Sequence, residues 1–165
     1  MNKKTLCLSL ALLCSVFLAP PSMAGPAISP AMQKYFADHG VSTYQDRGRV
    51  LLVMYSDRVF SSSHPTQLAP ESYVLIDAIS RLLNRVQPPK VSIRCFSSNQ
   101  NLSSRDALVL TQRQARHVAA YLWSQGVPYQ SMSYVGGGQR YPVAANTNNL
   151  GVYSNSRVEI RWQMF

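Results

Sequence analysis

The sequence predicts an α/β fold, a two-layer sandwich in which two main helices pack on one face of a mixed sheet of about four strands. Three observations predict it. Short β-branched runs alternate with two long amphipathic segments, the last run alternates apolar and polar residues, and the 165-residue chain is 46% hydrophobic. A chain of this size and composition forms one compact domain with short extensions at its ends.

The first 24 residues are interpreted as a signal peptide. "MNKK" is basic, an apolar run of 15 residues follows, and "SMA" ends at Ala24 with the small residues that a cleavage site favours. A lipoprotein signal acylated at Cys14 is the competing interpretation, which Leu13 disfavours because such signals place a small residue there. Cleavage would leave Cys95 alone, without a disulfide partner. We expect a periplasmic protein, with outer-membrane association as a further option and no transmembrane span in the mature chain.

Residues 25–48 are expected to form an N-terminal extension, ahead of a domain that spans residues 49–165. In the extension, "PAMQKYFADHG" predicts about two helical turns, with Pro30 near the start and Gly40 as the stop. The domain opens at Arg49 with "RVLLVMY", whose β-branched and apolar residues are typical of a buried strand.

Two further elements follow in the domain. Between Glu71 and Asn84, pairs of apolar residues recur every four positions, which predicts a helix with one wide apolar stripe. "QPPK" ends this helix, because the residue before a proline avoids the α region. "KVSIRCF" alternates apolar and polar side chains and predicts a half-buried strand.

The second long helix is expected to begin at Ser103, which is spaced from Asp106 as in a capping box, and to end before Gly126. "SMSYVG" then predicts a short strand, "GGGQRYPVAANTNN" a rigid turn and connector, and "RVEIRWQM" a final strand with one face on the core. The expected buried face of the second helix contains Leu108, Ala115, Val118, Ala119 and Leu122.

No motif points to catalysis. The triple glycine lacks the lysine and the following helix of a phosphate-binding loop. His39, His64 and His117 lie outside any "GxSxG" or "HExxH" pattern. We therefore expect no enzymatic activity, no cofactor and no metal site.

The charge of the chain favours anionic partners. Removing Lys3 and Lys4 with the leader leaves 14 basic and 7 acidic residues, a formal charge of +7. These residues are scattered, and no RNA-binding or zinc motif accompanies them, so we expect no nucleic-acid partner.

One long segment carries a family pattern: "LTQRQARHVAAYLWSQGVPYQSMSYVGGGQRYPVAANTNNLGVYSNSRVEI". It resembles the OmpA-like C-terminal domain, a periplasmic module that associates with peptidoglycan. With the strand, loop and helix from Arg49 to Leu83, the resemblance covers about 115 residues. The matching scaffold residues are Ala115, Val118, Tyr121, Leu122, Gly126, Gly136, Gly138, Pro142, Asn146, Gly151, Asn155, Arg157 and Val158.

The resemblance also implies a binding site with atypical residues. The family grips the diaminopimelate of the peptidoglycan stem with an aspartate that ends a "GHTD" strand and with the arginine of "RA"; these positions are Ser98 and Gln114 here. In the "NRRV" motif, Asn155 and Arg157 remain, and Ser156 replaces the first arginine. The peptidoglycan-binding candidates are thus Ser98, Gln114, Asn155 and Arg157. Each lost charge-assisted hydrogen bond would cost on the order of 1 to 2 kcal/mol, so binding should be weaker by a factor of about ten or more.

Two functions are compatible with this resemblance. In the first, the chain binds the peptidoglycan stem peptide and anchors an envelope structure to the cell wall. In the alternative, it is a structural protein–protein component of an envelope complex, such as a type IV or type VI secretion system, with an eroded peptidoglycan site. Its partners would then be envelope or secretion-system proteins.

Overall fold

The computed structural model describes residues 28–164, so the leader expected at residues 1–24 lies outside the described residues. In chain order the elements are α1 (Pro30–Asp38), β1 (Val41–Asp46), β2 (Arg49–Tyr55), α2 (Ser56–Val59), α3 (Ser72–Val86), β3 (Val91–Phe96), α4 (Ser104–Ser124), a 3₁₀ turn (Tyr129–Ser131), β4 (Met132–Gly138), α5 (Asn149–Asn155) and β5 (Arg157–Gln163).

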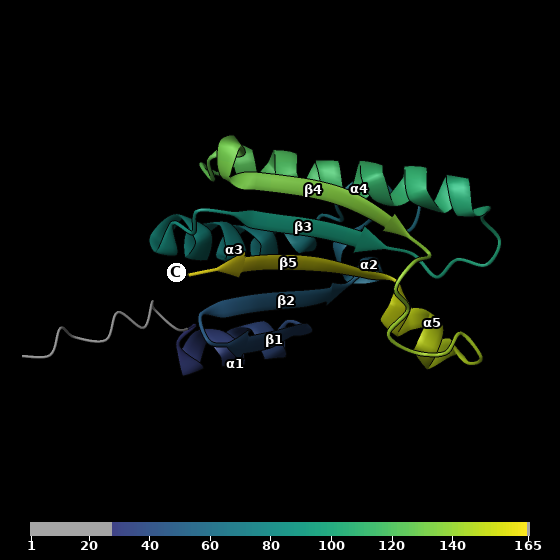
Figure 1. The fold of residues 1–165 in the computed structure, drawn as a ribbon, viewed down its shortest axis with the longest axis horizontal. Helices are drawn as coiled ribbons and strands as arrows, with labels where there is room; N and C mark the ends of the chain where they lie inside the picture. The colour runs from purple at the N-terminus through teal and green to yellow at the C-terminus, as the bar shows by residue number, and fades with distance from the viewer. Residues whose placement is uncertain (1–27, 165) are drawn as a thin grey trace, which may run out of the picture.

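The five strands form one mixed sheet in the order β1-β2-β5-β3-β4. β3 and β4 run parallel, and the other neighbours are antiparallel. Helices α1 and α3 lie behind the sheet and α4 runs along β4, so the face toward the viewer is open along the central strands (Figure 1). The predicted two-layer α/β sandwich is confirmed.

The core lies between the sheet and the helices. Leu52 of β2, Ile93 of β3 and Ile160 of β5 are fully buried, and they meet Ile79 of α3 and Leu122 of α4 in one apolar cluster. Burying a side chain of this size stabilises the fold by about 1.5 to 3 kcal/mol. The alternation seen in the sequence therefore marks the inner face of the central strands correctly.

The sheet has one strand more than the sequence predicts. Residues 41–46, assigned above to the extension, pair with β2 from Val41↔Met54 to Asp46↔Arg49. This edge strand buries only Val41, so the alternating pattern of a half-buried strand is missing. The structure closes this hairpin with Arg47 and Gly48, which both adopt positive φ, as a two-residue hairpin loop requires.

Helix α4 begins and ends as predicted, and four of the five residues expected on its inner face are buried, Leu108 being the exception. Ser103 accepts a hydrogen bond from the Asp106 N–H at 3.1 Å, and Gly126 follows the C-cap with φ +91°. Leu108, expected in the core, is 40% exposed, and Ala107 and Thr111 face inward instead. A helix advances about 100° per residue, so one position shifts the face that is buried.

The triple glycine lies inside β4, where α4 covers the free edge of the strand. The Gly136 N–H donates to Gln112 Oε1 at 2.7 Å, and the Gly138 N–H donates to Thr111 Oγ1 at 2.9 Å. A Cβ atom on Gly136 would overlap the backbone nitrogen of Gln112, and one on Gly137 would overlap the Phe96 ring. Close approach, and not only backbone freedom, explains these glycines.

The segment after β4 also differs from the prediction of a plain connector. Residues 139–148, here called the connector, lead into the short helix α5, which the sequence does not predict. The Asn148 side chain caps α5 by accepting from the Gly151 N–H at 2.8 Å. Such a short polar helix has no apolar stripe from which to predict it.

We expect Gly136→Ala and Gly137→Ala each to lower the free energy of unfolding by about 2 kcal/mol, because the added methyl group has no room. Urea unfolding measures the loss. Gly40→Ala is the matched control: its Cβ would meet nothing within 4 Å, and only its φ of +74° opposes the change. We expect about 1 kcal/mol there. Equal losses in all three variants would contradict the steric explanation.

Candidate functional site

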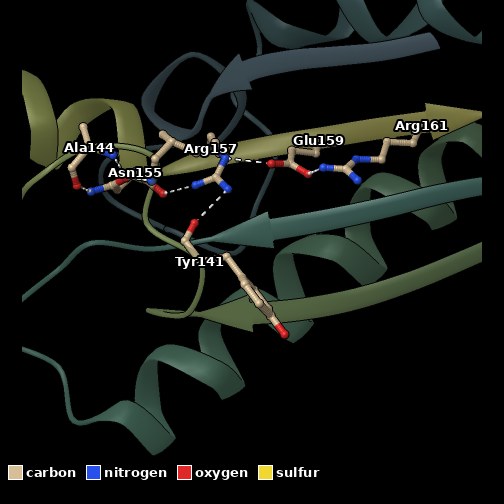
Figure 2. Close-up of polar contacts among 7 residues, drawn as sticks. Tyr141, Ala144, Asn155, Arg157, Glu159 and Arg161 are labelled. Carbon is tan, nitrogen blue, oxygen red and sulfur yellow. Dashed lines mark hydrogen bonds and ion pairs between the residues drawn. The ribbon is translucent and has the colours of Figure 1, made fainter. Parts of the chain in front are cut away.

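The candidate site lies at the end of the sheet where β3 ends and β5 begins. Asn155 closes α5, is 3% exposed and holds the connector through its amide group. Its Oδ1 accepts from the Val143 N–H at 2.6 Å and the Ala144 N–H at 3.1 Å. Its Nδ2 donates to Ala144 O and Asn146 Oδ1, both at 2.7 Å (Figure 2). The side chain thus fixes the path of the connector.

Arg157 is buried beside Asn155, with 4% of its surface exposed. Its guanidinium donates to Asn155 O at 3.3 Å and to Tyr141 O at 3.1 Å, as Figure 2 shows. It also lies 4.1 Å from the centre of the Phe96 ring, within the range of a cation–π interaction. One side chain of β5 therefore contacts both β3 and the connector.

The charge of Arg157 is compensated along β5. Its Nε donates to Glu159 Oε1 at 2.8 Å, and Arg161 donates to Glu159 Oε2, also at 2.8 Å. The Glu159 side chain is 5% exposed, whereas that of Arg161 is 47% exposed. A buried charge is tolerated only when its partners are in place, so these three residues act as one unit.

Ser98 lies two residues beyond β3 and is 3% exposed. Its hydroxyl donates to Val152 O and lies 2.8 Å from the Ser156 hydroxyl. The Ser98 N–H also donates to Ser156 Oγ, at 3.0 Å. Ser98 therefore ties the end of β3 to α5 and to the residue that precedes β5.

Gln114 lies elsewhere, on the inner face of α4, and is 5% exposed. Its Nε2 donates to Pro65 O at 2.7 Å, and His117, one turn along, contacts Thr66 O through Nδ1. These two side chains hold the loop of residues 61–69 against α4. Gln114 Oε1 is buried and has no hydrogen-bond partner among the described residues.

The structure thus brings together three of the four predicted site residues. Ser98, Asn155 and Arg157 are joined through the backbone and hydroxyl of Ser156, whereas Gln114 shares no hydrogen-bond partner with them. Sequence reasoning missed Phe96, Tyr141 and Glu159. The alternation of "RVEIR" was the available signal for Glu159, since it places positions 157, 159 and 161 on one face.

Cys95 is the cysteine that the structure describes, and its side chain is buried. Burial, with a smaller contribution from the Glu159 carboxylate, raises the pKa of the Cys95 thiol, which keeps it protonated. Within residues 28–164, no group of three or more histidine, cysteine, aspartate or glutamate side chains could hold a metal ion. Over the same residues, no helix is both long and apolar enough to cross a membrane.

Comparison with known proteins identifies the family. A family model described as "OmpA family" matches residues 60–156, more than half of the chain. The chain belongs to the OmpA family. It is 29% identical over 122 residues to "Probable lipoprotein YiaD" of Escherichia coli (strain K12), covering 73% of this chain and 54% of that protein. It thus spans about half the length of this curated relative.

Solved structures share the fold of this OmpA-family chain. A MotB-like protein from Desulfovibrio vulgaris matches with a TM-score of 0.72 and 21% identity, over 81% of this chain and 86% of that chain. The cell wall anchor of the T6SS from Pseudomonas aeruginosa matches with a TM-score of 0.71 and 23% identity, over 81% and 96%.

The departures from the OmpA-family pattern have a structural counterpart. Ser98 and Ser156, the positions at which the resemblance implies an aspartate and an arginine, hydrogen-bond each other. Both side chains are neutral, so this contact leaves no lone charge buried. Asn155 and Arg157, which match the pattern, hold the connector.

We expect Asn155→Ala to lower the free energy of unfolding by roughly 3 kcal/mol, because it removes four hydrogen bonds and leaves buried groups of the connector unpaired. Amide hydrogen exchange should accelerate at Val143 and Ala144. Asn149→Ala, the same change at an exposed residue of α5, should have little effect on either measurement. Unchanged exchange at Val143 and Ala144 would show that Asn155 does not hold the connector.

Proposed function

We propose that this OmpA-family chain is an exported, periplasmic protein that associates with peptidoglycan and anchors an envelope structure to the cell wall. Family membership supports the proposal, as does the fold shared with a cell wall anchor. A formal charge of +7 after leader removal would favour contact with the anionic wall. The chain acts by binding in this proposal, without catalysis.

One observation carries the proposal. Gln114 occupies the position of the family arginine, and its buried Oε1 lacks a donor among the described residues. Leaving a buried acceptor unpaired costs about 1 to 3 kcal/mol, so such an atom calls for an explanation. A hydrogen-bond donor of the stem peptide could complete it, and the Gln114 Nε2 could donate to the diaminopimelate carboxylate that the resemblance assigns to this position.

Access to Gln114 requires the loop of residues 61–69 to move. The loop rests on Gln114 through Pro65 O and on His117 through Thr66 O. Inside the loop, the Ser61 N–H donates to Gln67 O at 2.9 Å and the Gln67 N–H donates to His64 O at 2.8 Å, and neither bond involves α4. A stem peptide would displace these two contacts, and that competition adds to the weakening caused by the neutral site residues.

Sedimentation with purified sacculi tests the association. We expect the protein to sediment with sacculi at low salt. Gln114→Leu removes the amide and should weaken retention roughly tenfold, which corresponds to about 1.4 kcal/mol. Gln130→Leu is the matched control, because it makes the same substitution at an exposed glutamine outside the site.

Either of two outcomes would contradict the proposal. In the first, the protein remains in the supernatant at low salt. In the second, sacculi retain the Gln114→Leu and Gln130→Leu variants equally well. A titration with a diaminopimelate-containing stem peptide, followed by NMR, locates the contact. Shifts at Ser98, Gln114 and Arg157 would support binding at the family site.

A second function is favoured by a different observation. Ser98 and Gln114 are both buried and donate their hydrogen bonds to the protein itself. A former ligand site whose donors already bond the protein itself suits a structural component of an envelope complex, such as a type IV or type VI secretion system. The fold would then serve protein–protein contacts.

Cross-linking in the intact envelope tests this alternative. A structural component should form discrete cross-linked species with envelope proteins, and those species should persist when Gln114 is replaced by leucine. A protein that stays monomeric under cross-linking, with no envelope partner, would exclude it. Persistent partners together with failed sacculus sedimentation would favour this function over the first.

A further inference from the structure

The open face of the sheet is hollowed at the end opposite the candidate site. The hollow lies where β2 begins, β5 ends and β3 begins, and encloses about 860 Å³. The helices pack on the other face of the sheet (Figure 1), and residues of β2, β3 and β5 line this space. We refer to it as the open-face groove.

The strand register shows how the floor of the groove is built. Tyr44 of β1, Leu51 of β2, Arg161 of β5 and Ser92 of β3 lie side by side in one row across the sheet. Tyr44 is 60% exposed, and Leu51 is half-buried. The row therefore offers an apolar half on β1 and β2 and a polar half on β5 and β3.

The charges around this row are mainly positive. Arg49, Lys90 and Arg161 line the groove, and Asp46 is the acidic residue among its lining. Glu159, the nearest acid on β5, is buried and already pairs with two arginines. Arg161 is one of these two arginines, and Asp46 lies opposite Arg49 in the strand register. Arg49 and Lys90 are therefore the groove cations outside the ion pair with Glu159, and the groove keeps a net positive charge.

We propose that the open-face groove binds an extended acidic peptide segment of a partner protein, in which acidic and apolar side chains alternate. Glutamate or aspartate carboxylates would meet Arg49 and Lys90, since arginine forms two parallel hydrogen bonds with a carboxylate and lysine attracts it as a point charge. Apolar side chains of the segment would cover Tyr44 and Leu51. The mixture of apolar floor and basic rim suits such a strand-like ligand.

Other occupants fit the charges less well. A second copy of this chain would bring the same cations face to face, which is repulsive. Residues 1–27 contain no aspartate or glutamate, so this segment has no acidic side chain to offer. A flat anionic membrane would meet the rim of a concave groove without reaching Leu51.

The groove is separate from the proposed peptidoglycan site. Ser98 and Arg157 lie where β3 ends and β5 begins, whereas the groove lies where β3 begins and β5 ends. The two proposals can therefore fail independently, because each rests on side chains at its own end of the sheet.

Fluorescence anisotropy tests the proposal. The full chain is expressed, and the protein that the cell makes from it is purified for the measurement. The probe is a fluorescein-labelled peptide in which glutamate and leucine alternate. We expect saturable binding that the double variant Arg49→Glu, Lys90→Glu weakens at least tenfold. The matched control is Arg81→Glu, Arg105→Glu, which makes the same charge change at exposed residues of α3 and α4. Its affinity should change less than about threefold.

Further measurements make each outcome decisive. Urea unfolding must show that both double variants are folded, and NMR shifts induced by the peptide should centre on Leu51, Ser92 and Ser133. Equal weakening by both double variants would show attraction to net charge alone and would overturn the proposal. Absence of binding would also overturn it. The proposal would also be overturned if the protein bound phosphatidylglycerol vesicles but not the peptide, and if the Arg49 and Lys90 variant lost that vesicle binding.

Discussion

The contacts of the buried Arg157 guanidinium hold together the end of the sheet that carries the candidate site. The guanidinium joins β5 to the Phe96 ring of β3, to Tyr141 O in the connector and to the carboxylate of Glu159. Taking a charge out of water is costly, so every partner must be present at once. Gly137 belongs to the same arrangement, because a side chain there would displace the ring that Arg157 covers.

Helix α4 connects this end of the molecule with the rest of the fold. On one side its Thr111 and Gln112 satisfy two edge N–H groups of β4, which covers an edge that could otherwise pair with another chain. On the other side Gln114 and His117 hold the loop of residues 61–69. The close fit against β4 fixes the helix. The helix in turn sets the direction in which the Gln114 side chain points.

Two surfaces at opposite ends of one sheet suggest how the chain could link two components. The side chains of Ser98, Asn155 and Arg157 are held by hydrogen bonds within the protein, whereas the open-face groove presents the exposed cations Arg49 and Lys90. A wall contact at one end would leave the groove free for an acidic partner, since the sheet separates them. Part of the excess of basic residues would then bind an acidic partner in the groove, in addition to attracting anionic partners at long range.

The sequence by itself determined the α/β class, the central strands, the two long helices, the Ser103 cap and the role of Gly126. These depend on periodicity and on local capping, which neighbouring residues encode. Only the tertiary structure decided that residues 41–46 join the sheet, that residues 149–155 form a helix, and that Gly136 and Gly137 are needed for close approach. It also decided that Ser98 and Ser156 bond each other and that Gln114 holds Pro65. These features arise from contacts between residues far apart in the chain, and no local pattern records which partner a buried polar group will find.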